Sequence, residues 1–171
     1  MKLIRVVLML LSLLGIVFLI ISTAGTAWGK DDSQTNFNEA VTDIGLWKSC
    51  RGEVCTAYLE EVIEGWWFAI RVEMILAIII SFTGFILSMV MIVRESVKGY
   101  YLAGLLAPAA FLAFIGVCTW MSKINKPYKI GYSCVLGVVG VVILVTAIIA
   151  AIISTWRMKK QQNSSSAALM Y

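Results

Sequence analysis

The chain has 171 residues, of which 60% are hydrophobic and 14% are charged, and its formal net charge is +4. This length suits a single domain, and the apolar share exceeds that of soluble domains, so we expect a membrane protein. Histidine is absent, which removes the commonest general base and the commonest metal ligand. We therefore expect no enzyme: no catalytic residue, no metal, no cofactor and no nucleic-acid partner.

The first apolar run covers about residues 6–27 and follows Lys2 and Arg5. An uncharged run of this length can cross a bilayer core about 30 Å thick. Small residues near its end leave a cleaved signal peptide as the alternative, although the apolar part of a signal peptide is only about 7–15 residues long. We expect a retained membrane helix.

A polar loop is expected over about residues 28–73, and it contains a close cysteine pair. Cys50 and Cys55 are separated by a short stretch that includes Arg51-Gly52-Glu53. Such spacing suits a tight hairpin whose strands are joined by a disulfide, and the flanking residues include good strand formers. Near its end the loop carries an aromatic run that is typical of a membrane surface: Trp66, Trp67 and Phe68.

The cysteine pair occurs together with a set of residues that resembles the claudin superfamily. This superfamily contains the claudins, the peripheral myelin and epithelial membrane proteins, the lens fibre membrane intrinsic protein and the calcium-channel gamma subunits. The short gap between the cysteines is most similar to the lens fibre, myelin and epithelial membrane proteins. Besides the cysteines, the matching residues are Trp28, Gly45, Leu46, Trp47 and Arg71.

Three further apolar runs cover about residues 74–93, 99–121 and 130–156. The third run of the chain contains Pro108, which is tolerated in membrane helices and is expected to kink this one. A short loop is expected at 122–129. The residues at 1–160 are thus predicted to form one four-span membrane domain, and the serine-rich tail at 161–171 is predicted to be disordered.

Four spans place both termini on the same side of the membrane. The short flanks on that side carry seven basic residues and only one acidic residue, Glu95, so the positive-inside rule predicts that both termini are cytoplasmic. The cysteine pair then faces outward, where disulfides persist. The basic residues are Lys2, Arg5, Arg94, Lys98, Arg157, Lys159 and Lys160.

The four apolar runs contain no Asp, Glu, Lys or Arg. Transporters, proton relays and voltage sensors need such groups within the membrane, so these classes lose support. Small residues recur at intervals that allow helices to approach closely, which favours a compact bundle and leaves a dimer face open. They are Ala77, Ser81, Gly84 and Ser88, then Ala103 and Ala107, and finally Ala147 and Ala151.

We therefore predict an all-α membrane protein, a four-helix bundle with a small extracellular antiparallel sheet. The resemblance implies that the second outer loop adds a strand to this sheet. Trp28 and Trp47 are expected to anchor the sheet at the bilayer surface, where a tryptophan has one apolar and one wet end. Cys118 and Cys134 are expected to be buried apolar residues, and a second disulfide between them stays open.

The sequence shows no pattern of residues typical of catalysis or transport. Together with the resemblance, this favours a structural tetraspan protein of the plasma membrane that organises cell contacts or membrane domains. Its partners would be lipids, further copies in cis and in trans, and other membrane proteins. The alternatives are an auxiliary subunit of a channel or receptor and a role in vesicle membranes. The candidate contact surface comprises the hairpin tip and the aromatic run, although the tryptophans of that run could serve only as membrane anchors: Arg51, Gly52, Glu53, Trp66, Trp67 and Phe68.

Overall fold

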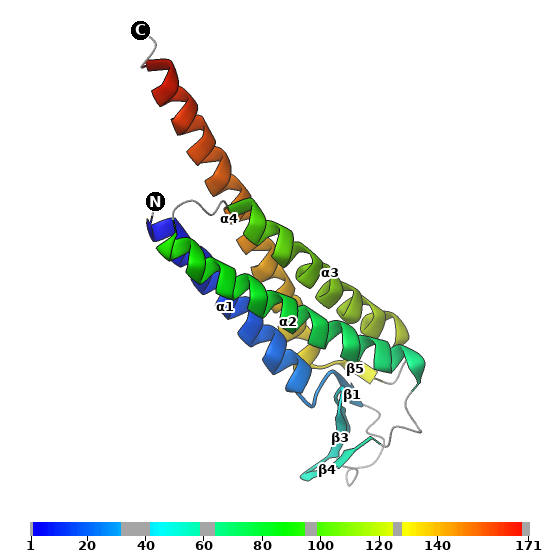
Figure 1. Ribbon diagram of the computed structural model, residues 1–171. Coiled ribbons are helices and arrows are strands. Elements are labelled where there is room, and N and C mark those ends of the chain that lie inside the picture. Colours follow the sequence, from blue (N-terminus) through cyan, green and yellow to red (C-terminus); the bar gives the residue numbers. More distant parts are fainter. Residues whose placement is uncertain (1, 32–41, 59–63, 95–98, 125–127, 169–171) are drawn as a thin grey trace.

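The computed structural model describes residues 2–31, 42–58, 64–94, 99–124 and 128–168. Within these residues, four helices lie side by side in an elongated bundle, and each is long and apolar enough to cross a membrane (Figure 1). The helices are α1 (Lys2–Ala24), α2 (Gly65–Val93), α3 (Gly99–Lys123) and α4 (Tyr132–Ala168).

A five-stranded antiparallel sheet lies at one end of the bundle, which we call the sheet end (Figure 1). The strand order is β4-β3-β2-β1-β5, so the strand from the second loop pairs with the strand that follows α1. This confirms the predicted fold class and the strand that the resemblance implied. The strands are β1 (Gly29–Asp31), β2 (Thr42–Ile44), β3 (Lys48–Arg51), β4 (Val54–Ala57) and β5 (Tyr128–Ile130).

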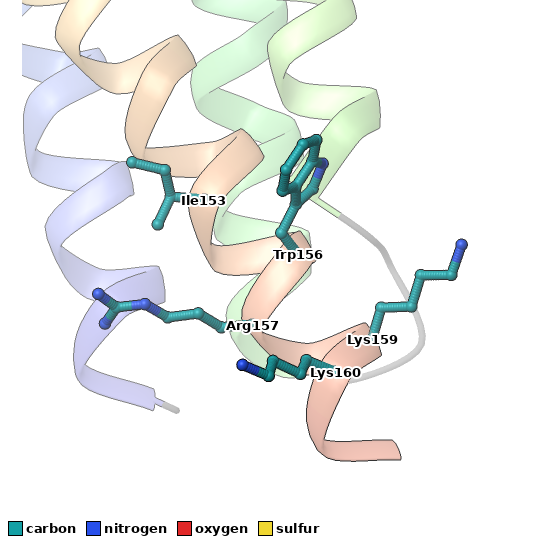
Figure 2. A pocket seen from close by; sticks show the side chains of 5 residues that line it. All are labelled: Ile153, Trp156, Arg157, Lys159 and Lys160. Atoms are coloured by element: carbon teal, nitrogen blue, oxygen red, sulfur yellow. The ribbon is translucent and has the colours of Figure 1, made fainter. Parts of the chain in front are cut away.

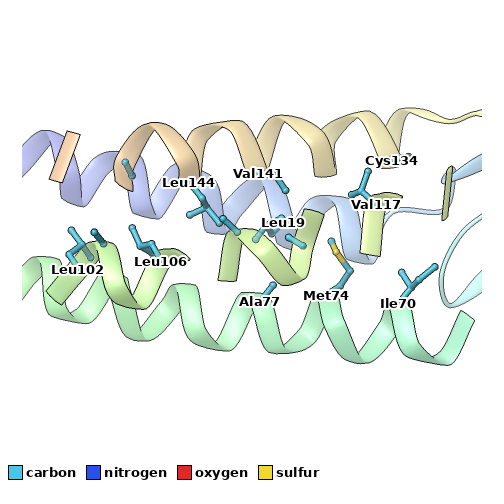
Figure 3. Close-up of a cluster of buried hydrophobic side chains, with 14 of the residues drawn as sticks. Leu19, Ile70, Met74, Ala77, Leu102, Leu106, Val117, Cys134, Val141 and Leu144 are labelled. Atoms are coloured by element: carbon cyan, nitrogen blue, oxygen red, sulfur yellow. The ribbon is translucent and has the colours of Figure 1, made fainter. Parts of the chain in front are cut away.

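The bundle packs around small and aliphatic side chains that face its centre from all four helices (Figure 3). Helices α1 and α3 each contact both α2 and α4, which makes a closed ring of neighbours. Of the small residues predicted to mediate packing, all except Ala107 are buried inside the bundle. At Gly84, for example, an added Cβ would lie 2.7 Å from Leu106 Cδ2. These positions therefore serve packing within one chain.

Two helices differ from their predicted bounds at the sheet end. Helix α2 begins at Gly65 rather than near residue 74, because no helix-breaking residue separates the aromatic run from the apolar one. The backbone N–H groups of Trp67 and Phe68 already donate to the Glu64 carbonyl. Helix α1 ends at Ala24, three residues before the predicted end at 27, and the chain then enters β1.

Helix α4 also differs from prediction, because it continues to Ala168 through most of the tail that was predicted to be disordered from residue 161. Residues 157–168 contain no glycine or proline that would end a helix. Extending an existing helix avoids the cost of nucleating a new one, so a polar tail can continue it. Residues 169–171 lie outside the described part of the chain.

We predict that Gly131→Ala destabilises the fold by about 1–3 kcal/mol, the usual cost of overpacking. An added Cβ would contact the Ala27 carbonyl oxygen and lie 2.6 Å from its carbon, and both are backbone atoms that cannot rotate away. Thermal unfolding in detergent measures the change.

The matched control is Gly104→Ala in α3, where an added Cβ meets nothing within 4 Å. Alanine favours a helix by about 0.5–1 kcal/mol over glycine, so this variant should unfold no earlier than the parent protein. Equal melting temperatures for the two variants would contradict the packing seen at Gly131.

Candidate functional site

The cysteine pair joins the two strands of the β3–β4 hairpin, as predicted. Cys50 and Cys55 are register partners, their Cα atoms are 4.0 Å apart, and a disulfide links them. Gly52 begins the two-residue turn with φ 61°, a backbone conformation that suits glycine and the type II′ turn of hairpins. The other two cysteines, Cys118 and Cys134, are free thiols, so the second disulfide that the sequence left open does not form. Cys134 is buried as expected, whereas the expectation of burial was wrong for Cys118, which is exposed on α3.

The link between β2 and β3, residues 45–47, is held by side chains of α2. The backbone carbonyl of Leu46 accepts hydrogen bonds from Trp67 Nε1 at 3.0 Å and from Arg71 Nε at 2.7 Å. The guanidinium of Arg71 also lies over the ring of Trp47, 4.8 Å from its centroid, in a cation–π contact. Motif residues 25 positions apart in sequence thus meet at one carbonyl.

The other two contacts of this link reach the end of α1. Trp47 Nε1 donates to the Thr23 carbonyl at 2.9 Å. An added Cβ at Gly45 would lie 2.8 Å from Gly25 O and 2.8 Å from Thr26 Cα, both backbone atoms. Glycine is therefore required at residue 45 because two chain segments pass at van der Waals distance.

Trp28 occupies the centre of the junction between sheet and helices and is wholly buried. Its Nε1 donates to the Ser22 carbonyl at 2.7 Å, and its own carbonyl accepts from Trp120 Nε1 at 3.1 Å and Gly131 N at 2.9 Å. The expectation that Trp28 anchors the sheet at the bilayer surface with one wet end was wrong, since the residue has no exposed surface. Its long-range backbone and aromatic partners enclose it instead.

Trp120 connects the aromatic residues into one cluster. Its ring lies 5.5 Å from that of Trp28, 5.0 Å from Trp67 and 6.0 Å from Trp66, centroid to centroid. Tyr58 extends the cluster, edge to face with Trp67 at 5.0 Å, and burial raises the pKa of its hydroxyl above the ordinary value. Trp120 was missed from the sequence because it sits at the end of an apolar run with no motif around it.

The candidate contact residues fall into two groups that differ in exposure. Arg51, Gly52 and Glu53 are all exposed at the tip of the β3–β4 hairpin, which projects from the sheet end of the bundle (Figure 1). In the aromatic run, Phe68 is 61% exposed, whereas the two tryptophans are half-buried in the cluster. Their role in contacts with other molecules stays a prediction.

This arrangement fixes a shape rather than a reactive centre. Four of its tryptophans and Arg71 donate hydrogen bonds to backbone carbonyls, which orients the sheet on the bundle. Among the residues that the structure describes, no group of three His, Cys, Asp or Glu side chains is placed to hold a metal ion. The site is best described as a buried junction that holds an exposed hairpin at the end of a membrane bundle.

The sequence of the chain matches the model of a known protein family. The sequence model of the PMP-22/EMP/MP20/Claudin family matches residues 1–146, a range that includes the sheet and every residue of the junction. No curated protein matches the chain.

Replacing both Cys50 and Cys55 by serine should destabilise the hairpin by about 2 kcal/mol, the loop-closure entropy expected for a disulfide across so few residues. The measurement is thermal unfolding of the purified protein, alongside non-reducing peptide mass mapping of the parent chain. Cys118→Ala, which removes a free thiol on α3, is the control and should leave the melting temperature unchanged. Two free thiols at residues 50 and 55 in the mature protein would contradict the structure.

Proposed function

Because the chain belongs to the PMP-22/EMP/MP20/Claudin family, we propose that it is a structural membrane protein that organises contacts between cells or membrane domains. In this proposal the protein lies in the plasma membrane, also at cell junctions. Its sheet end faces the outside of the cell. The protein associates with further copies of itself in the same membrane and in the opposing one.

The observation that carries the proposal is the hairpin held in one orientation with its tip exposed. A three- or four-residue strand is marginal by itself, but here the disulfide and the carbonyl contacts of Leu46 hold it. Strand β4 is an edge of the sheet and its four residues are exposed, so it can accept a further strand or present side chains to a partner. A preorganised surface loses little entropy on binding.

The orientation follows from charge at the two ends of the bundle. The end opposite the sheet, which we call the basic end, carries the arginines and lysines at the start of α1, after α2 and along α4. The positive-inside rule favours a cytoplasmic position for this end and for both termini. The disulfide at the sheet end then faces an oxidising compartment, which agrees with its persistence.

An auxiliary subunit of a channel or receptor is the second candidate. Helix α3 presents Phe111 and Phe114 outward, 63% and 54% exposed, and an aromatic face of this kind could be covered by another membrane protein as well as by lipid. Co-purification of a channel or receptor in stable ratio, together with an even distribution over the cell surface, would favour this candidate.

Epitope tags test the orientation. Tags placed before Met1 and after Tyr171 should both be accessible to antibody only in permeabilised cells, because α1 begins and α4 ends on the side of the basic end. A tag inserted after Glu53 should be stained on intact cells and serves as the positive control. Staining of a terminal tag on intact cells, or loss of the first tag by cleavage, would contradict the four-span topology.

Mixed cultures test the contact role. We expect the protein to concentrate at borders between two expressing cells and not at borders with non-expressing cells. Trp47→Ala should abolish this enrichment by releasing the link between β2 and β3, whereas Trp156→Ala at the basic end should preserve it.

The double variant Arg51→Glu with Glu53→Arg distinguishes an effect on contact from an effect on folding. It keeps Gly52 and the net charge and exchanges the positions of the positive and the negative charge at the hairpin tip. It should reach the surface in normal amount and show weaker enrichment, because exposed charges determine partner choice. Unchanged enrichment in this variant would exclude the tip from the contact surface.

A further inference from the structure

A groove lies between α1 and α4 at the basic end. It encloses about 320 Å³ and is lined mainly by apolar side chains of both helices, among them Leu3, Ile4 and Ala150. Ser154 and Arg157 line it as well, and they stand one turn and two turns beyond Ala150 along α4. The groove thus combines an apolar wall with a cationic group on the side where α4 leaves the bundle.

A second hollow of about 200 Å³ continues the groove toward α2, because both are lined by Ile4, Ser154 and Arg157. Its lining adds Arg5, a buried residue of α1 whose Nη1 donates to the Met91 carbonyl at 2.8 Å. Two guanidinium groups from different helices therefore border the same space. The hydrogen bond to α2 fixes the position of one of them.

Arg157 also borders a third hollow, of about 680 Å³, on the surface of α4 (Figure 2). Figure 2 shows the Arg157 side chain extended toward α1, with Lys160 beside it and Lys159 on the other side of the helix. Among the residues that the structure describes, those that line these three hollows include no Asp or Glu. The charged side chains among these described lining residues are therefore all cationic.

We propose that this site binds an anionic phospholipid, with an acyl chain in the groove and the phosphate against Arg157. Apolar walls that end in a cationic group match an amphipathic ligand with a negatively charged head. Arginine suits the phosphate because its planar guanidinium can donate two parallel hydrogen bonds. Trp156, 76% exposed next to this arginine, matches the preference of tryptophan for the headgroup level.

The groove argues for a lipid and against a soluble phosphate compound. A soluble ligand would use the cations alone and would leave the apolar part of the groove empty. A bound lipid occupies both and links the start of α1 to the basic segment of α4. With the orientation proposed above, the site faces the cytoplasmic leaflet, where anionic lipids are concentrated.

The test uses the full chain purified in neutral detergent and titrated with short-chain phosphatidylserine, with binding followed by native mass spectrometry and by melting temperature. We expect phosphatidylserine to bind and stabilise the protein, and short-chain phosphatidylcholine to do so at least about tenfold more weakly. Arg157→Gln should weaken phosphatidylserine binding about tenfold, as expected for loss of a charge-assisted hydrogen bond. Arg157→Lys should weaken phosphatidylserine binding less than Arg157→Gln does, because lysine keeps the positive charge.

The matched control is Lys123→Gln, which removes one positive charge at the sheet end and should leave binding unchanged. Ala150→Phe, which fills the groove and keeps every charge, should also weaken lipid binding. Melting temperatures without lipid show that the variants are folded.

Three results would overturn the proposal. Equal binding of phosphatidylcholine would exclude recognition of charge. Equal binding of glycerophosphoserine, which has no acyl chain, would indicate a site for soluble phosphates. Equal losses in Arg157→Gln and Lys123→Gln would exclude the groove as the location.

Discussion

The backbone carbonyl of Leu46 is the group on which the arrangement of sheet and bundle depends. A buried carbonyl without a partner costs about 1–3 kcal/mol, and this one is satisfied by two side chains of α2, Trp67 and Arg71. Because Arg71 also lies over the ring of Trp47, one helix residue fixes both the backbone and the neighbouring side chain of the link between β2 and β3. The sheet is thereby attached to the bundle at a defined angle.

The same principle recurs across the junction, where four tryptophans donate their indole N–H groups to backbone carbonyls. Such a side chain contributes a large apolar surface and one polar contact, which suits a boundary between a membrane bundle and a polar sheet. The strands have only three or four residues each, too few for independent stability. Their order comes from the helix ends, the aromatic cluster around Trp120 and the disulfide.

The bundle itself separates two ends of different character. Its centre is packed mainly by small and aliphatic residues that face inward from every helix (Figure 3), with a few buried serines among them. The sheet end is rigid and presents an exposed hairpin tip. The basic end has hollows between helices, bordered by Arg5 and Arg157, where an amphipathic ligand fits. The two proposals thus place contact with other proteins and binding of an anionic lipid at opposite ends of one chain.

The sequence by itself determined the four spans, the Cys50–Cys55 hairpin and the family, because hydropathy, cysteine spacing and a short motif are local signals. It did not determine the burial of Trp28 or the role of Trp120. Each of these depends on contacts between residues far apart in the chain, such as the 92 positions between Trp120 and Trp28. Likewise, only the folded bundle brings Arg5 and Arg157 to one hollow, because hydropathy fixes where a helix lies but not which of its faces meets another helix.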